Sequence, residues 1–422
     1  MSFEIGTFIE NLSRCSAESP GVTRLPFTEA SQMGWEYICR TMEALGLAVR
    51  TDPYGTILGH LEGERPERVV IGSHYDSVIH GGKYDGVAGI AVGLMAAAHF
   101  VETGTKPAFS LDILANNDEE GITFTKGFLS SKRVCGLLKE GEYKNPMTGK
   151  TLKTCLAQGW YAKGGRGRDD IRLTTALERA VCFIEPHIEQ GGILWSSGER
   201  IGVVRHIVGC TRLYVTVNGL SNHAGTTPMN LRRDPLAAAG RIIGQIPQLT
   251  RAYPGAVATV GQIFCMPNVS NVIPNQVRFT VDIRSASDAD RKRLGEEVRR
   301  LVARESPMEF EIIQGAREEA VPMKTELVRA MEEICGELGI AYRVMDSGAV
   351  HDAQVFGTAL DTVMLFIPSR DGLSHCPEEF SRLEDLETAA RVLVRYCEGS
   401  GSGAAETKTK FALENDLCYT TG

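Results

Sequence analysis

Four short apolar runs in this sequence are each followed at once by histidines and carboxylates. The polar segments cover residues 73–77 with 81–86, 116–121, 185–191 and 368–375. Functional groups gather at the carboxyl ends of strands in open α/β sheets, so we expect these segments to meet at one edge of a sheet. Five of the nine histidines lie in these or similarly polar segments: His74, His187, His223, His351 and His375.

The candidate donors are imidazoles and carboxylates, with no accompanying set of thiolates. Imidazole nitrogen and carboxylate oxygen suit borderline to hard divalent cations such as Zn, Mn or Co. A bridging carboxylate can hold two such ions about 3.5–4 Å apart, and the pair activates a water near neutral pH. The adjacent Glu119 and Glu120 suit a division between metal binding and proton transfer. No local spacing fixes the number of ions, but this chemistry favours two.

The elements that must position these residues are those of an α/β domain. Short apolar runs alternate with helical patterns along most of the chain, which is typical of that class. The run at 87–100 is long enough for a buried helix. Runs too short for helices, and therefore predicted to be strands, are 69–72, 109–115, 181–184 and 363–367.

The segment from about 210 to 320 has a different pattern. Residues 212–218 and 277–284 alternate strictly between apolar and polar side chains, which predicts strands with one covered and one polar face. Helical patterns occur at about 235–248 and 289–304. We therefore expect a two-layer α+β domain at 210–320, inserted in a catalytic mixed α/β domain made of 1–209 and 321–397. The small, polar segment 398–422 is expected to be a flexible tail outside the fold.

Composition excludes several classes of protein. The net charge of −8 argues against nucleic acid as a partner, because such binding needs clustered Lys and Arg. No apolar run approaches the roughly 18 residues of a transmembrane helix, and the start lacks the pattern of a secretory signal. The 11 cysteines are scattered without a CxxC pair, which indicates reduced thiols in a cytoplasm. We expect a cytoplasmic enzyme without nucleic-acid or membrane partners.

An ordered series of motifs resembles the amidase/carbamoylase branch of the M20 metallopeptidase superfamily. The motifs are HYDSVIHGGKYDGVAG, DEEG, EPHIEQG, SNHAGTTPM, NVSNVIP, VDIRS and GLSHCPEE. The branch includes N-carbamoyl-L-amino-acid hydrolases, allantoate and ureidoglycolate amidohydrolases and β-ureidopropionases. The resemblance spans about residues 20–397 and implies a zinc-exopeptidase-like catalytic domain with a lid domain that also dimerises. We therefore expect a homodimer.

The resemblance also implies a metal site with two divalent ions, Zn or Mn/Co, in each subunit. Asp85 would be the carboxylate that bridges both ions. The remaining ligands would be His74 and His187 for one ion, and Glu120 and His375 for the other.

Further roles follow from the same motifs. Glu119 would be the general base, and Asp76 would orient the imidazole of His74. His223 would polarise the scissile carbonyl, delivered across the dimer. A guanidinium can bind a carboxylate through two parallel hydrogen bonds, which suits an α-acid substrate. The substrate would be held by Gln190, Asn271, Arg284 and Arg212.

The histidine at position 187 points to one reaction class. Peptidases of the superfamily generally have an acidic residue there, and histidine is similar to the ureido-hydrolysing members. We expect a hydrolase of non-peptide C–N bonds that acts on a small N-carbamoyl-L-amino acid, allantoate or ureidoglycolate and releases ammonia and carbon dioxide. A dimetal aminopeptidase or dipeptidase is the alternative, and a non-catalytic binding protein of the same fold is a third.

Three residues depart from the common motifs of the branch. Thr123, Cys210 and Val350 stand where the family often has arginine, glutamine and glycine. These departures predict an altered substrate pocket, but they do not name the substrate.

Overall fold

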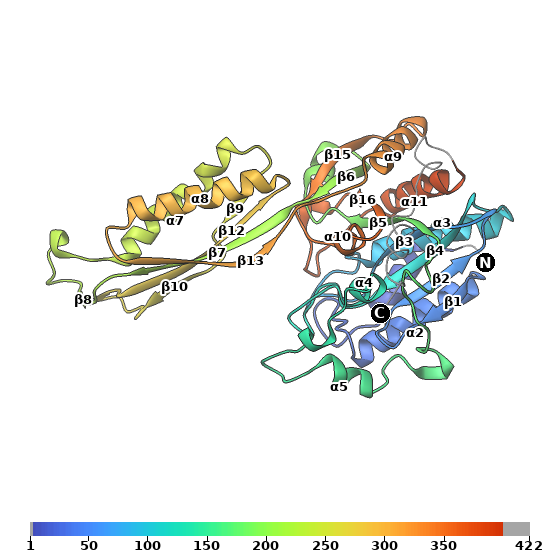
Figure 1. Ribbon diagram of the computed structural model, residues 1–422, viewed down its shortest axis with the longest axis horizontal. Helices are drawn as coiled ribbons and strands as arrows, with labels where there is room; N and C mark the ends of the chain where they lie inside the picture. The colour runs from blue at the N-terminus through green and yellow to red at the C-terminus, as the bar shows by residue number, and fades with distance from the viewer. Residues whose placement is uncertain (1–2, 400–422) are drawn as a thin grey trace, which may run out of the picture. The chain divides into compact units, whose positions relative to one another are not determined.

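The computed structural model describes residues 3–399, so the predicted tail at 398–422 lies almost wholly outside the described residues. The fold is a mixed α/β arrangement divided into two compact units (Figure 1). Unit 2 is His206–Val321, and unit 1 contains the described chain on either side of it. Among residues 3–399, no helix combines the length and apolar character that crossing a bilayer requires.

A mixed sheet forms the centre of unit 1. Its strand order is β1-β2-β4-β3-β5-β16-β6-β14, and β15 pairs with β6. Strands β3, β4, β5 and β16 run parallel to one another, so their carboxyl ends lie at the same edge. The strands are β1 (Ala48–Thr51), β2 (Ile57–Leu61), β3 (Arg65–His74), β4 (Phe109–Asn116), β5 (Ala180–Ile188), β6 (Ile201–Ile207), β14 (Val321–Pro322), β15 (Tyr342–Ser347) and β16 (Asp361–Ile367).

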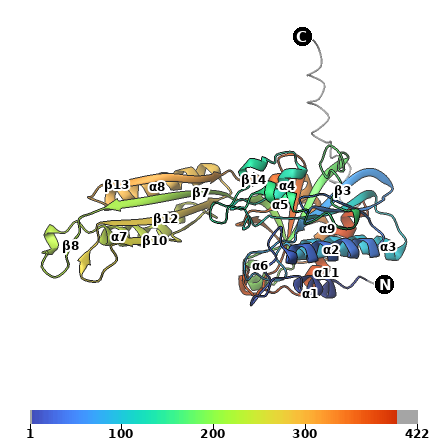
Figure 2. The ribbon, with the colours of Figure 1, turned by 90° about the horizontal axis from the view of Figure 1, so that it is seen from below.

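Helices cover this sheet. Helices α1, α3 and α11 pack against one another (Figure 2), and α3 also packs on β3, β4 and β5. The α-helices are α1 (Ile5–Ser13), α2 (Glu29–Ala44), α3 (Val87–Thr103), α4 (Leu129–Val134), α5 (Leu152–Ala157), α6 (Ile193–Ser197), α9 (Thr325–Glu337), α10 (Asp352–Phe356) and α11 (Leu383–Cys397). Short 3₁₀-helices lie at Glu140–Glu142, Lys163–Gly165 and Arg370–Gly372.

The core of unit 1 explains its apolar runs. All residues of β4 and β5 are buried, because the strands of a parallel sheet are covered on both faces. Helix α3 approaches the sheet so closely that a Cβ on Gly89 would lie 2.0 Å from the carbonyl oxygen of Pro186 in β5. Small residues in α3 therefore set how tightly this helix packs against the strands that carry the site.

Strand β5 is longer than the sequence pattern predicted. The apolar pattern indicated a strand at 181–184 followed by a polar segment, but β5 continues through His187 to Ile188. Its polar residues are buried in the sheet, where hydrogen bonds and neighbouring polar groups satisfy them.

Unit 2 is a two-layer α+β domain. Its sheet has the order β10-β12-β7-β13, with β9 pairing with β12, and α7 and α8 cover one face (Figure 1). The apolar residues of the alternating strands, such as Leu213, Val215 and Phe279, pack beneath these helices. Its elements are β7 (Gly209–Asn218), β8 (Asn222–His223), α7 (Pro235–Leu249), β9 (Val257–Thr259), β10 (Ile263–Met266), β11 (Val272–Ile273), β12 (Gln276–Ser285), α8 (Asp288–Glu305) and β13 (Phe310–Glu318), with 3₁₀-helices at Met229–Leu231 and Thr250–Ala252.

Candidate metal centre

Five residues from separate segments of unit 1 converge around one buried carboxylate. His74 ends β3, Asp85 lies in the loop before α3, and His187 lies near the end of β5. Glu120 follows β4, and His375 lies in the loop after β16. Their donor atoms form two groups, His74–Asp85–His187 and Asp85–Glu120–His375, and in each group all the atoms lie within 4.8 Å of one another. The two groups share Asp85.

Asp85 presents each of its oxygens to a different group. Its Oδ1 lies 3.3 Å from Nε2 of His187 and 3.8 Å from Nε2 of His74. Its Oδ2 lies 3.0 Å from Nε2 of His375, and the same nitrogen lies 3.4 Å from Oε1 of Glu120. A carboxylate in this position can donate to cations on both of its sides.

The buried imidazoles are held in the tautomer that a metal ligand needs. Nδ1 of His187 is 2.8 Å from the carbonyl oxygen of Ile188, and Nδ1 of His74 is 3.1 Å from that of Asp76. A carbonyl oxygen only accepts, so Nδ1 carries the proton in each ring. The lone pair of Nε2 then faces Asp85.

The charges at the centre fit a divalent cation. Burial opposes ionisation of Asp85, but the hydrogen bond with His375 and the nearby imidazoles outweigh it and hold the Asp85 pKa below its usual value. Burial and the charge of Asp85 raise the pKa of Glu120 to about 8. Oε1 of Glu120 is buried and accepts no hydrogen bond. A bound cation would compensate the charge of these clustered carboxylates and would use the free donor atom of Glu120.

Glu119 lies beside the two groups that share Asp85 but belongs to neither of them. Three donor atoms lie within 4.8 Å of one another here: a carboxylate oxygen of Glu119, a carboxylate oxygen of Glu120 and a ring nitrogen of His74. Burial raises the pKa of Glu119 well above its usual value. A carboxylate with a raised pKa is suited to accept a proton from water near neutral pH.

Asp76 has a second structural role that the sequence did not indicate. Its Oδ1 lies 3.6 Å from Nδ1 of His74, the residue that it was expected to orient. Its two oxygens also accept the backbone N–H groups of Glu119 and Glu120, at 3.1 and 3.2 Å. Asp76 therefore connects the end of β3 with the segment that follows β4.

Gln190 lies within the centre itself. Its Nε2 is 3.2 Å from each oxygen of Asp85, 3.2 Å from Nε2 of His375 and 3.3 Å from Oγ of Ser374. An amide there can donate to Asp85, and it is also placed to contact a group that enters the site.

Unit 2 brings His223 and Asn271 together. Strand β8 pairs with β11 through His223 and Val272, and the carbonyl oxygen of Asn271 accepts the N–H of Ala224 at 3.0 Å. Nδ1 of His223 accepts the N–H groups of Gly225 and Thr226, at 3.1 and 3.2 Å. The ring proton of neutral His223 is therefore on Nε2, and the side chain is exposed.

The two candidate arginines lie on the polar face of the unit 2 sheet. One oxygen of Asp282 pairs with Nε of Arg284 and the other with a terminal nitrogen of Arg212, each at 2.9 Å. Cys210, where the family often has glutamine, has its Sγ 3.5 Å from the second oxygen. Asp282 thus fixes the positions of both guanidinium groups.

Sequence reasoning missed a buried polar network next to the imidazoles. Oε2 of Glu185 accepts the N–H of Ala353 at 2.6 Å, and the side chain of Asn116 donates to Asp352 at 2.8 Å. The ring centroid of His351 lies 4.5 Å from that of His187. Period-two alternation could have identified Glu185, because it lies two residues before His187 on the same face of β5.

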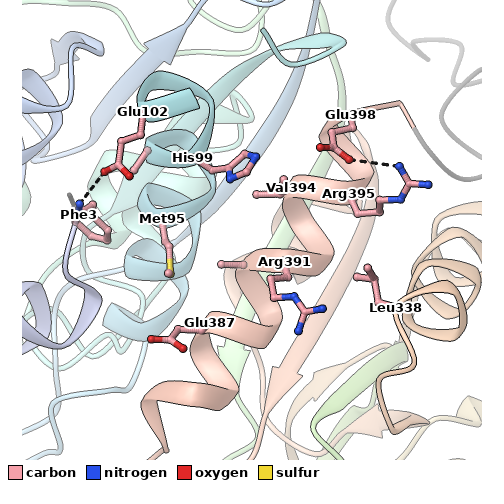
Figure 3. Close-up of a pocket in the computed structure, with 12 residues that line it drawn as sticks. Phe3, Met95, His99, Glu102, Leu338, Glu387, Arg391, Val394, Arg395 and Glu398 are labelled. Atoms are coloured by element: carbon pink, nitrogen blue, oxygen red, sulfur yellow. Dashed lines mark hydrogen bonds and ion pairs between the residues drawn. The ribbon is translucent and has the colours of Figure 1, made fainter. Parts of the chain in front are cut away.

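A groove elsewhere on unit 1 contributes nothing to this chemistry. It has a volume of about 330 Å³ and is lined by residues of α3 and α11, including Met95, His99 and Arg391 (Figure 3). None of the described residues that line it is a candidate site residue. The geometry of the donor atoms, rather than the presence of a cavity, identifies the candidate centre.

Comparisons with known proteins show which family the chain belongs to. Residues 67–399 match the model of peptidase family M20/M25/M40. The chain is 36% identical over 407 residues to N-carbamoyl-L-amino-acid amidohydrolase of Paenarthrobacter aurescens, covering 92% of this chain and 95% of the relative. It is 36% identical over 401 residues to allantoate amidohydrolase of Bacillus subtilis, with the same coverage.

The chain is also similar to solved structures. The crystal structure of an amidase of the hydantoinase/carbamoylase family from Burkholderia multivorans has a TM-score of 0.86 and 29% identity. The match covers 96% of this chain and 98% of that one. The chain therefore belongs to peptidase family M20/M25/M40.

Proposed function

We propose that this protein is a metal-dependent amidohydrolase that cleaves the ureido or carbamoyl C–N bond of a small acid. The substrate is an N-carbamoyl-L-amino acid or a related ureido acid such as allantoate or ureidoglycolate, and the products include ammonia and carbon dioxide. The observation that carries the proposal is the pair of histidine–carboxylate groups sharing Asp85, with Glu119 beside them. The names of the relatives support the choice of a ureido or carbamoyl bond.

Two divalent ions, Zn or Mn/Co, are the proposed cofactors of each subunit. His74 and His187 would hold one ion, Glu120 and His375 the other, and Asp85 both. When bound, such ions polarise a carbonyl oxygen and lower the pKa of water. The two-sided geometry of Asp85 supports the count of two.

Glu119 is the proposed general base. Its carboxylate takes a proton from the attacking water, whose oxygen bonds to the carbonyl carbon of the substrate. The C–N bond then breaks, and Glu119 returns the proton to the leaving nitrogen as ammonia departs. The remaining carbamate loses carbon dioxide. Asp76 keeps the Glu119 backbone in place through its hydrogen bond to that amide.

Residues of unit 2 are proposed to bind and orient the substrate. Nε2–H of His223 would donate to the carbonyl oxygen as negative charge develops there, which the hydrogen bonds to Nδ1 favour. Arg284, Arg212, Asn271 and, from unit 1, Gln190 would hold the acid or amide end. Held by Asp282, the arginines keep a fixed orientation for a carboxylate.

We further propose a cytoplasmic homodimer in which unit 2 acts as the lid and supplies His223 to the partner's site. The ten described cysteines are all free thiols, which supports a reducing compartment. The aminopeptidase or dipeptidase alternative has less support, because these relatives are named for carbamoyl and allantoate hydrolysis.

A substrate screen tests the reaction class. Protein loaded with Zn, Mn or Co should release ammonia from at least one ureido acid among N-carbamoyl-L-amino acids of varied size, β-ureidopropionate, ureidoglycolate and allantoate. A panel of dipeptides is the control and should remain uncleaved. Peptide cleavage without ammonia release would reject the proposal in favour of the alternative.

The adjacent glutamates should separate into a catalytic and a binding role. Glu119→Gln should lower kcat by about 10²- to 10⁴-fold because the proton acceptor is lost, while the metal content stays that of the parent. The matched variant Glu120→Gln should lower the metal content itself, because it removes an anionic ligand. Turnover and elemental analysis of the two variants decide this, and equal metal loss in both would refute the assignment.

Metal affinity should increase with pH. The hydrogen bond with Asp85 raises the pKa of His375 to about 9 against the effect of burial, and the pKa of Glu120 is about 8. Both groups hold a proton at pH 6 that a cation must displace, so affinity should rise by up to about tenfold per pH unit for each proton released. Competition with a chelator at pH 6, 7 and 8 measures this. An affinity independent of pH would contradict the assignment of these ligands.

A further inference from the structure

We propose that Glu379 is a positioning residue that joins the two loops carrying Asp85 and His375. This inference rests on the proposed metal site, but it concerns a residue outside the set of ligands, base and substrate contacts. Glu379 lies four positions after His375 and is almost completely buried, with 3% of its surface exposed. A buried carboxylate needs compensating donors, and the identity of those donors indicates its role.

Both oxygens of Glu379 bind the loops of the metal centre. Oε1 accepts the backbone N–H of Tyr84 at 2.9 Å and that of Asp85 at 3.0 Å. Oε2 accepts the hydroxyl of Ser374, the residue before His375, at 2.8 Å. The side chain of Glu379 therefore contacts the backbone of Asp85 on one loop and Ser374, the neighbour of His375, on the other.

The loop that carries His375 needs such support. His375 has φ of 58°, in the left-handed region that residues other than glycine adopt only when their surroundings hold them there. Gly86, directly after Asp85, has φ of 65°. Glycine adopts a positive φ readily, so the disfavoured conformation is that of His375, and the hydrogen bond from Ser374 to Glu379 lies directly before it.

Gly82 provides the space that Glu379 occupies. A Cβ on Gly82 would lie 2.1 Å from Oε1 of Glu379 and 2.4 Å from its Cβ. A side chain at position 82 would therefore displace the carboxylate from the amides of Tyr84 and Asp85. Glycine here is explained by the approach of Glu379 to the loop.

Cobalt binding tests this role without depending on turnover. Metal-depleted protein is titrated with Co²⁺, and affinity is taken from the visible absorption of the bound ion and from competition with a chelator. Glu379→Ala should weaken Co²⁺ binding by about 10- to 100-fold, as loss of a group that orients metal ligands does. Glu379→Gln should bind nearly as well as the parent, because its carbonyl still accepts both amides and its NH₂ can donate to Ser374.

Asp52→Ala is the matched control. Asp52 is also a buried carboxylate, and its Oδ1 accepts two backbone amides, those of Tyr54 and Thr56 at 3.0 and 2.9 Å. These amides belong to the loop between β1 and β2, so Asp52→Ala should keep the Co²⁺ affinity of the parent even if the protein melts at a lower temperature. Equal weakening in Asp52→Ala and Glu379→Ala would overturn the proposal.

A second variant keeps the test decisive if Glu379→Ala does not fold. Gly82→Ala should weaken Co²⁺ binding in the same direction, because it displaces the carboxylate without removing it. Parent-like affinity in a folded Glu379→Ala or in Gly82→Ala would overturn the positioning role. A parent protein that binds no Co²⁺ would instead refute the proposed metal site, and the inference with it, so the two failures are distinguished by the parent alone.

Discussion

The candidate centre depends on the burial of one negative charge, that of Asp85, among imidazoles from three separate segments. A buried carboxylate is costly unless its charge is compensated. His375 pairs with Oδ2 of Asp85, and Nε2 of His74 and of His187 face Oδ1, where a cation held between them would compensate the charge on that side. The parallel strands β3, β5 and β16 bring these histidines to one edge of the sheet. The close packing of α3 against β3 and β5 places the loop of Asp85 at the same edge. The packing of the sheet and of α3 therefore determines the geometry of the candidate centre.

Three further carboxylates, those of Asp76, Glu379 and Asp282, hold candidate site residues in position. Asp76 joins the end of β3 to the backbone of Glu119 and Glu120. Glu379 contacts the loop before α3 and the residue before His375. In unit 2, Asp282 holds two guanidinium groups with its two oxygens. In each case a carboxylate fixes groups that would otherwise move independently, as a site with separately supplied parts requires.

Much of this could be predicted because local patterns carry it. Short apolar runs ending in polar residues indicated β3, β4 and β16, because a strand buried on both faces is apolar throughout. Strict alternation indicated β7 and β12, because a strand buried on one face is apolar only at every second residue. The family and its mixed α/β fold, expected from the ordered motifs, are confirmed by the comparisons. The end of β5 was not predicted, because polar residues that are satisfied inside a sheet resemble a loop in sequence.

The supporting contacts could not be predicted for a different reason. Glu379 bonds to amides nearly three hundred positions earlier in the chain, and no periodicity links residues so far apart. The second role of Asp76 is likewise visible only once β3 and β4 are paired side by side. Motif resemblance identifies residues that a family shares, but the contacts that hold those residues in place are a property of the folded chain.

The proposed two-ion site is tested most directly by anomalous X-ray diffraction at the zinc edge from crystals of the Zn-loaded protein. Two anomalous peaks are expected on opposite sides of Asp85, each about 2.0–2.2 Å from one of its oxygens. One peak should also contact His74 and His187, and the other Glu120 and His375. Crystals without anomalous density at Asp85, or with zinc bound only by residues outside these five, would contradict it.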